Sequence, residues 1–244
     1  ERGINFMRRQ VAAGRPFLLQ VSHYPDRISR INPEEMIAAA RDMDTAFGQL
    51  LDTLDELDAA RNTYVLFTTD HGTQGNGLNG PLSTGKGSVL EGGLRVPFIV
   101  AGPRVRSGEW SPLPVTALDV FPTIAELSGN ADKVTADVEG GSLAGVLRDA
   151  DAKVARSREE IVFHFPHYDL RNAGPASALL LGDYKLVRNY EDDETLLYDL
   201  SVDPGEQNDL SAKLADLVED LGARLEAYLL EIGAQMPRPN PAYR

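Results

Sequence analysis

The residues best suited to chemistry in this chain are Asp70, His71 and Lys86. A carboxylate oxygen and an imidazole nitrogen placed side by side can both bind a divalent cation. Lys86 stands between Gly85 and Gly87, and an ammonium group with such small neighbours can approach an anionic ester group closely. Together these residues predict a site where a metal ion and a lysine meet an anionic substrate.

Two apolar runs flank these residues and predict the elements that position them. Residues 63–69 are β-branched and aromatic and predict a strand buried on both faces, and residues 96–101 predict a second interior strand. The stretch between them is rich in Gly, Asn, Pro and Ser, which predicts a loop. Asp70 and His71 therefore follow the carboxyl end of a strand, where the sites of open α/β sheets gather. A motif this short is also typical of an ordinary loop start with a solvated lysine behind it.

Composition and charge exclude several classes of function. The chain has 244 residues, 42% of them hydrophobic, which is enough for one large domain or two unequal ones. Its net charge of −13 argues against nucleic acid as a partner, because phosphate backbones need a basic face. No apolar run reaches the roughly 20 residues that span a bilayer. The absence of cysteine excludes disulfides, zinc-thiolate sites and a cysteine nucleophile.

A longer pattern around the predicted site resembles the sulfatase family, which belongs to the alkaline-phosphatase-like superfamily. The segment from Gly85 to Pro97 matches the family signature G-K-G followed by E-G-G-x-R-x-P. Residues 119–123 resemble the family's D-x-F-P-T helix start, and residues 197–206 resemble its L-Y-D-L-x-x-D-P-x-E segment. Nearly the whole chain is similar, in order, to the C-terminal half of a sulfatase.

This resemblance implies hydrolysis of a sulfate ester at an activated nucleophile beside a divalent cation. It implies that Asp70 and His71 are metal ligands, with calcium the most expected ion and magnesium the other choice. It implies that Lys86 binds the sulfate group and is a catalytic residue. Family members complete the metal site with acidic residues from their N-terminal half. A periplasmic or secreted location also fits the family, although no signal region is visible in this sequence.

Three further residues are candidates for the same site. Sulfatases carry a histidine after an early strand, often in an H-Y-x-x-H segment. His23 matches the first histidine and is a catalytic candidate, whereas Arg27 replaces the second. Arg27 can bind an anionic oxygen but cannot exchange protons near neutral pH. His167, in the sequence FHFPHY, resembles an H-x-P-H-Y segment close to the substrate pocket.

Purely structural roles for these histidines also stay open. His23 also fits a purely structural residue. His164 also fits the core face of its strand, with His167 capping the loop that follows.

Two competing functions fit parts of the pattern. Phosphoester and phosphonate hydrolases of the same superfamily commonly have Asp-His, where sulfatases more often have Asp-Asn. The segment from Glu91 to Pro97 nevertheless favours a sulfatase. A degenerate, non-catalytic binding domain that keeps the fold is the other alternative, and Arg27 in place of a histidine supports it.

The N-terminal part of the chain is predicted to be an α/β structure. Residues 17–21 predict a strand, and a helix with a regular apolar face is predicted from Asn32-Pro33 to about residue 61. With the strand at 63–69 these elements form a β-α-β unit, for which a right-handed crossover is expected. Residues 115–127 predict two short helical pieces divided at Pro122.

The C-terminal part is predicted to be a small antiparallel sheet covered by one helix. Strands are predicted at residues 161–165, 178–181, 184–188 and 195–200. Gly182-Asp183 suits a type II′ hairpin turn, and apolar residues from Leu214 to Ile232 recur on one helical face. We expect residues 1–155 to be the C-terminal part of an alkaline-phosphatase-like α/β domain and residues 156–244 to be a separate α+β domain.

The nucleophile is not recognisable in this chain. Sulfatases use a formylglycine made from Cys or Ser in a C/S-x-P/A-x-R segment near their N-terminus. This sequence has no Cys, and none of its serines begins such a segment. The chain alone is therefore expected to be inactive. Because it shows only about three strands of a larger sheet, we expect it to associate with itself or with the missing N-terminal half.

Overall fold

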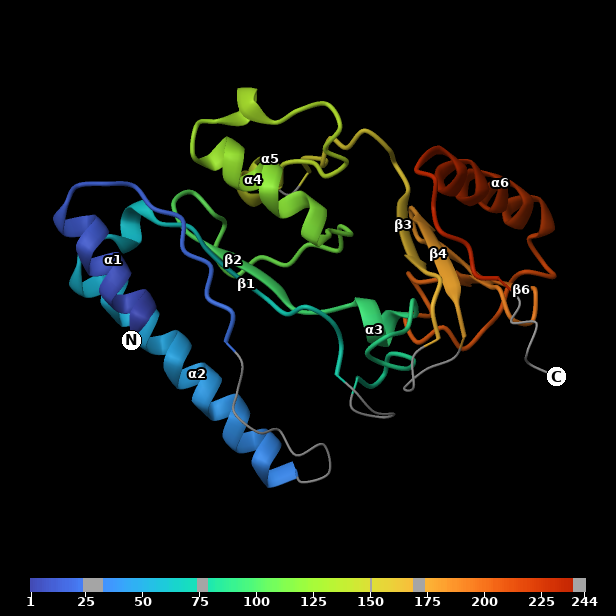
Figure 1. The fold of residues 1–244 in the computed structure, drawn as a ribbon, viewed down its shortest axis with the longest axis horizontal. Helices are drawn as coiled ribbons and strands as arrows, with labels where there is room; N and C mark the ends of the chain where they lie inside the picture. Colours follow the sequence, from blue (N-terminus) through green and yellow to red (C-terminus); the bar gives the residue numbers. More distant parts are fainter. Residues whose placement is uncertain (24–32, 74–78, 150, 169–173, 239–244) are drawn as a thin grey trace. The chain divides into compact units, whose positions relative to one another are not determined.

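A computed structural model describes residues 1–23, 33–73, 79–149, 151–168 and 174–238 (Figure 1). Contacts divide the chain into two compact units, and each unit is described by itself. The first unit consists of Glu1–Phe67, Ile99–Pro112 and Gly145–Ala152. The second consists of Thr68–Phe98, Leu113–Ala144 and Lys153–Arg244. The expected boundary at residue 155 stays a prediction.

The first unit packs two helices with a short sheet. Helix α1 (Arg2–Ala12) lies beside α2 (Pro33–Glu56), and Arg8 Nη2 is 3.1 Å from Glu56 Oε2. Strands β1 (Val65–Thr68) and β2 (Phe98–Ala101) are hydrogen-bonded neighbours. The Phe47 ring of α2 lies 5.4 Å from the Phe67 ring of β1, so the apolar face of α2 covers this sheet, as its periodicity predicts.

The strand predicted at residues 17–21 is wrong. In the described part of the chain these residues belong to no strand, although Leu19 lies close to Gly3 of α1. Leu18 is 69% exposed and Val21 is 49% exposed. An apolar segment becomes a strand only when another strand offers its backbone hydrogen bonds, and the described residues provide no such partner here.

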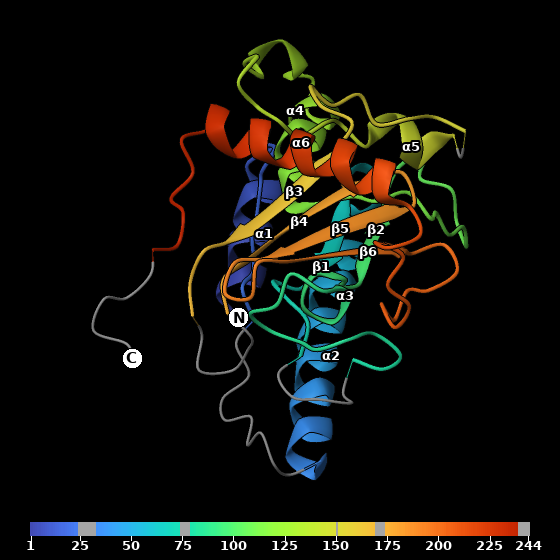
Figure 2. The same cartoon turned by 90° about the vertical axis from the view of Figure 1, so that its right-hand side faces the viewer.

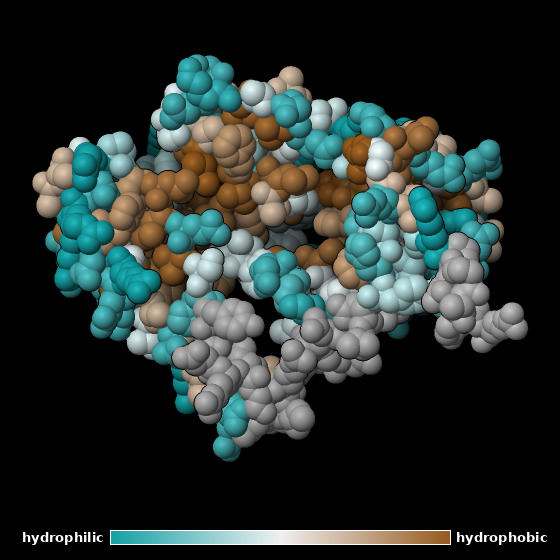
Figure 3. All heavy atoms as spheres, in the orientation of Figure 1, coloured by the Kyte–Doolittle hydropathy of each residue, from teal (hydrophilic) through white to brown (hydrophobic). Residues whose placement is uncertain are grey.

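Apolar side chains remain uncovered on the first unit. Besides Leu18 and Val21, Ile37 of α2 and Ile99 of β2 are more than half exposed. Brown, apolar surface is visible in Figure 3 over the region of the N-terminal segments and β2. Contiguous exposed apolar surface of this kind usually marks a face that another segment or chain covers.

The second unit is built on a four-stranded antiparallel sheet, as predicted. Its strands run in the order β3 (Ile161–Phe165), β4 (Ala176–Leu181), β5 (Tyr184–Asn189) and β6 (Glu194–Asp199). Helix α6 (Ala215–Glu231) lies across one face of the sheet (Figure 2). Leucines from the helix and from three strands form the core there: Leu179, Leu186, Leu197, Leu221, Leu225 and Leu229. The predicted hairpin turn is confirmed, because Gly182 has a φ of 59°.

The remaining helices of the chain are short. The second unit carries α3 (Glu91–Leu94), α4 (Val120–Leu127) and 3-10 turns at Ala117–Asp119 and Ala131–Lys133. A third 3-10 turn, at Ala60–Asn62, belongs to the first unit, and a further helix, α5, spans Ala144–Arg148. Among the described residues, no helix is both long and apolar enough to cross a bilayer.

The predicted division of the 115–127 region at Pro122 is wrong. The break lies between the 3-10 turn and α4, and Pro122 sits inside the first turn of α4. A proline is tolerated there because the first N–H groups of a helix have no partner within the helix.

Asp119, the first residue of the D-x-F-P-T segment, holds this region together. Its carboxylate is fully buried and accepts hydrogen bonds from Arg156 Nε at 2.8 Å and Arg156 Nη2 at 2.7 Å. The N–H groups of Gly141 and Thr116 donate to it at 2.9 and 2.8 Å. Burial alone would raise the pKa of Asp119, but these four hydrogen bonds outweigh it and lower the pKa below the ordinary value of 3.8.

We expect Asp119→Ala to lower the free energy of unfolding by about 3–5 kcal/mol, because it leaves the Arg156 charge buried without its partner. A lowered pKa stabilises the fold above the ordinary value of 3.8, and this contribution is lost as the pH falls through the folded-state pKa. Urea unfolding should therefore show a gap between the two proteins at neutral pH that narrows below about pH 4. The matched control is Asp132→Ala, which removes an exposed carboxylate paired with Lys133. An equal loss in both variants would contradict the prediction.

Candidate functional site

Asp70 and His71 follow the end of β1 in the turn that the sequence predicts. The Asp70 side chain is 81% exposed, and its Oδ2 lies 3.1 Å from His71 Nε2. The other ring nitrogen, Nδ1, lies 2.8 Å from the carbonyl oxygen of Gly72. The two predicted metal ligands are therefore side by side, and the backbone fixes the histidine ring.

The contacts of the His71 ring bear on how it could bind a cation. A carbonyl oxygen only accepts hydrogen bonds, so the contact of Nδ1 with the Gly72 carbonyl is a hydrogen bond when Nδ1 carries a proton. In neutral His71, Nε2 then presents a lone pair to a carboxylate oxygen. Two acceptors at 3.1 Å repel each other unless a proton or a cation lies between them. This donor set fits a divalent cation, with the Gly72 carbonyl as the outer-shell partner that orients the histidine.

The described residues contain no cluster of three or more His, Asp or Glu side chains that could hold a metal ion. The Asp70-His71 pair alone does not make a complete metal site, and the assignment of these two residues as metal ligands stays a prediction.

Lys86 lies in a loop that is fastened to the turn after His71. The Lys86 N–H donates to the Thr73 carbonyl at 3.2 Å. Asn79 bridges the two segments, because its Nδ2 donates to the carbonyls of Thr73 at 3.0 Å and Thr84 at 2.8 Å, and its Oδ1 accepts from the Thr73 N–H at 2.8 Å. A side chain at Gly85 would place its Cβ 2.2 Å from the Thr73 oxygen, so only glycine fits. The turn at Asp70-His71 and the loop that carries Lys86 are therefore one packed structure.

The glycines of the E-G-G segment allow α3 to join this structure. The Gly72 N–H donates to the Gly93 carbonyl at 3.0 Å, and the Gly92 N–H donates to Ser83 at 2.8 Å. A Cβ at Gly72 would lie 1.8 Å from the Gly92 oxygen, and one at Gly92 would lie 2.2 Å from the Ser83 oxygen. These glycines are required by close backbone contact and not by an unusual φ angle.

A buried ion triad that sequence reasoning missed lies behind this loop structure. Lys185 of β5 is 1% exposed, and its Nζ lies 2.9 Å from Glu91 Oε1 and 2.8 Å from Glu206 Oε1. The other Glu206 oxygen accepts the Glu91 N–H at 2.7 Å. Burial raises the pKa of Glu206, and the nearby Lys185 opposes this rise. The sequence carries no local signal for this triad, because the burial of Lys185 beside Leu186 and Val187 appears only in the structure, where a buried ammonium requires carboxylate partners.

The Glu206 carboxylate also acts on Tyr198 of the L-Y-D-L segment. Burial, followed by the charge of Glu206, raises the pKa of Tyr198 to about 12. Lys185 and Tyr198 are paired residues across β5 and β6. The two longest sequence signatures, at residues 91–97 and 197–206, therefore meet around Lys185.

The histidines of the FHFPHY segment have different environments. His164 Nδ1 lies 2.6 Å from the Ser177 hydroxyl, which also contacts the Tyr190 hydroxyl at 2.8 Å, and His164 Nε2 lies 2.9 Å from the Gln235 carbonyl. These contacts favour the structural interpretation of His164. His167 is exposed, with its ring edge-on to Phe165 at 5.6 Å.

His23 belongs to the first unit, where its Nε2 lies 3.6 Å from Asp42 Oδ2. Arg27 lies outside the described residues.

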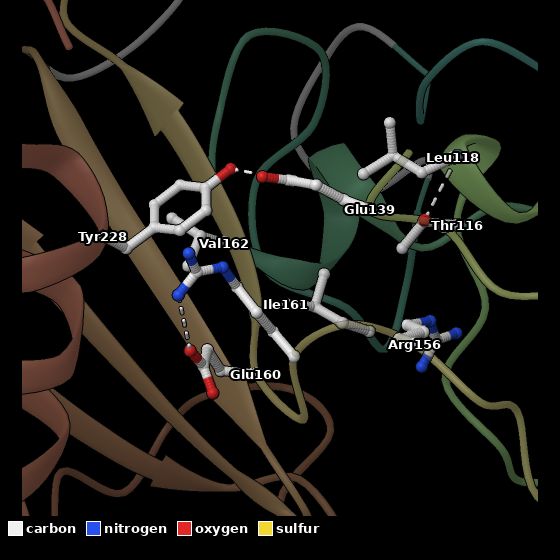
Figure 4. A pocket seen from close by; sticks show the side chains of 10 residues that line it. Thr116, Leu118, Glu139, Arg156, Glu160, Ile161, Val162 and Tyr228 are labelled. Atoms are coloured by element: carbon white, nitrogen blue, oxygen red, sulfur yellow. Dashed lines mark hydrogen bonds and ion pairs between the residues drawn. The ribbon is translucent and has the colours of Figure 1, made fainter. Parts of the chain in front are cut away.

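Two of the hollows in the described part of the second unit bear on the site. One, of about 30 Å³, is shown in Figure 4; its polar groups pair with one another, for example Tyr228 with Glu139 at 3.0 Å. The other, of about 130 Å³, borders the lysine loop at Gly87 and Ser88 and reaches Phe165 of β3. The second hollow is the one that adjoins the predicted site.

Comparison with solved structures identifies the class of fold. The crystal structure of Ps i-CgsB superposes with a TM-score of 0.77 and 24% identity, covering 93% of this chain and 53% of that one. Together with the mixed helix and sheet content, this places the chain in the alkaline-phosphatase-like α/β fold class, with the α+β structure of β3–β6 and α6 after it.

Sequence comparisons identify the family. The model described as Sulfatase matches residues 28–130, and the model described as N-sulphoglucosamine sulphohydrolase, C-terminal, matches residues 85–232. A sulfatase of Formosa agariphila is 34% identical over 79% of this chain and 39% of its own length. The steryl-sulfatase of Mus musculus is 33% identical over 84% of this chain and 39% of its own length. The chain belongs to the sulfatase family, and it spans about two fifths of the length of these relatives.

Proposed function

We propose that the chain is the C-terminal part of a sulfatase that hydrolyses a sulfate ester. The observation that carries the proposal is the joining of the Asp70-His71 turn and the Lys86 loop into one packed structure through Thr73 and Asn79. An ammonium group and two potential metal ligands on one short framework suit an anionic ester whose cleavage develops negative charge.

In this proposal Lys86 binds the sulfate group and stabilises the charge that develops on it. His167 is proposed as a substrate contact, because the hollow beside Gly87 and Ser88 also reaches Phe165, two residues before it. Arg27 is proposed as a second anion contact, and His23 as a catalytic residue, both on the family resemblance alone.

We further propose that Asp70 and His71 would hold a divalent cation, most readily calcium. The cation would supply a positive charge next to the ester when bound. Calcium and magnesium both prefer oxygen ligands, so the nitrogen of His71 favours neither ion, and magnesium is the other candidate. The formylglycine nucleophile would come from the N-terminal half of the enzyme, which would also cover the apolar side chains of the first unit. The family likeness supports a secreted or periplasmic location.

Asp70→Ala in the full-length enzyme is expected to lower the bound divalent metal, because it removes the exposed carboxylate of the pair. Elemental analysis after desalting, compared with the wild type, measures this. Asp132→Ala, which removes an exposed carboxylate of the same unit, is the control. Unchanged metal content in Asp70→Ala would refute the metal assignment.

The same enzyme distinguishes the second candidate function. His71 in place of asparagine favours a phosphoester or phosphonate hydrolase of the same superfamily. Assays with matched aryl sulfate and aryl phosphate esters should show a clear preference for the sulfate. A preference for the phosphate would overturn the sulfatase proposal in favour of this alternative.

A further inference from the structure

We propose that Lys185 and Glu206 are positioning residues for the loop that carries Lys86, so that the C-terminal sheet holds the substrate-binding loop in place. This inference rests on the proposed function of Lys86. It concerns residues that lie far from the Asp70-His71-Lys86 cluster in sequence, 94 and 115 positions from their partner Glu91.

An ion pair connects the C-terminal sheet to α3. Lys185 contributes an ammonium group that lies 2.9 Å from Glu91 and 2.8 Å from Glu206, and it is almost completely buried. Glu91 is the first residue of α3, and its backbone N–H donates a hydrogen bond to the Glu206 carboxylate. One cation therefore joins β5, the turn after β6 and the start of α3.

Helix α3 in turn contacts the candidate site through its backbone. The residues after Glu91 are the glycines whose backbones contact Gly72 and Ser83. Gly72 directly follows His71, and Ser83 belongs to the same loop as Lys86. A shift of α3 would therefore move both the turn at Asp70-His71 and the Lys86 loop, because segments in such close backbone contact cannot move independently.

A second set of contacts fastens the same loop to the same turn. The Ser83 hydroxyl donates to the Gly205 carbonyl and accepts from Gln207 Nε2 at 2.9 Å. Asp203 shapes this turn by accepting the N–H groups of Gln207 at 2.9 Å and Asn208 at 2.7 Å. The D-P-x-E segment therefore presents both Glu206 and the partners of Ser83 to the lysine loop.

The charges explain why Lys185 is needed at this position. Without its ammonium group, the carboxylates of Glu91 and Glu206 would stay buried close together, and the remaining nearby cation would be the half-exposed Arg95, 3.8 Å from Glu91 Oε2. Like charges in a poorly solvated site repel, and the simplest relief is for α3 to move away from the turn. The result would be a displaced Lys86 loop on a sheet that keeps its own leucine core.

The experiment is Lys185→Met in the full-length enzyme, since methionine has a similar length and no charge. We expect kcat/KM for an aryl sulfate to fall by about 10²-fold, the effect typical of a misplaced reacting group. In hydrogen exchange measured on peptides, residues 79–94 should exchange faster, while residues 176–199 of the sheet keep their protection.

Arg156→Met is the matched control. It also removes a cation from a buried carboxylate, Asp119, in the same unit. It should lower the melting temperature, yet leave kcat/KM and the exchange of residues 79–94 unchanged. If Arg156→Met altered both of these as Lys185→Met does, the effect would be general destabilisation and the proposal would be wrong.

A double-mutant cycle with Lys86→Ala separates positioning from a structural role. If Lys185 acts through Lys86, Lys185→Met should lower kcat/KM by a much smaller factor in the Lys86→Ala background than in the wild type. If Lys185→Met lowered kcat/KM by the same factor in both backgrounds, or left the hydrogen exchange of residues 79–94 unchanged, the proposal would be overturned.

The test also covers a variant that does not fold and a wild-type enzyme that is inactive on sulfate esters. If Lys185→Met fails to fold, Glu206→Gln replaces it, because glutamine retains an acceptor for the Glu91 N–H and removes only the charge; the same exchange criterion then applies. If the wild-type enzyme hydrolyses no sulfate ester, the proposed function fails, but the exchange of residues 79–94 still decides whether Lys185 positions the loop.

Discussion

Lys86→Ala in the full-length enzyme is expected to reduce kcat by about 10²–10³-fold, the loss usual for one preorganised charge-stabilising contact. The lysine stands on a loop whose backbone is fixed to Thr73 and Asn79, so its position is set before substrate binds. A group that is already in place stabilises developing charge without the cost of reorganisation. The loss should therefore appear in kcat as well as in kcat/KM.

Lys133→Ala is the control for this variant. Lys133 belongs to the same unit, is exposed, and pairs with Asp132 at 2.7 Å on the surface. It should leave turnover unchanged, because exposed ion pairs contribute little. Steady-state kinetics with an aryl sulfate, and binding of inorganic sulfate by the same proteins, measure both variants. Near-native turnover of Lys86→Ala would exclude the assigned role.

The second prediction is that the 244-residue chain alone will not turn over substrate. It has no cysteine, and its nearest look-alike of the formylglycine segment, Ser111-Pro112-Leu113-Pro114, has Pro in the wrong place and no Arg at the fifth position. Without a nucleophile, the covalent step that divides a difficult hydrolysis into two easier ones cannot begin. If Asp70 and His71 bind a cation as proposed, two ligands alone would also hold it weakly.

The measurement is an assay of the purified chain with aryl sulfates and aryl phosphates, with calcium and magnesium supplied. The full-length enzyme in the same assay is the positive control, and far-ultraviolet circular dichroism establishes that the chain is folded. Metal-dependent multiple turnover by the chain alone would mean that it contains a nucleophile of another kind.

The sequence by itself determined the family, the C-terminal sheet and the two longest helices, α2 and α6. Patterns with a local cause were predictable: the hairpin at Gly182 depends on one glycine conformation, and α6 on an apolar face that recurs along its length. The side-by-side placement of Asp70 and His71 also follows from their adjacency at a strand end. The strand at residues 17–21 was wrong, because a strand depends on a partner that a local pattern does not contain.

Only the tertiary structure decided how the lysine loop is held. Lys185 sits among apolar neighbours in a hairpin strand, and nothing local distinguishes it from a strand residue with its charge in solvent. Its partners are Glu91, 94 positions away, and Glu206 beyond the next strand. Such contacts arise when the sheet, the turn and α3 fold together and enclose the charges. A buried ammonium group is stable only when its carboxylate partners are in contact with it, and here those partners come from distant segments that only the complete fold brings together.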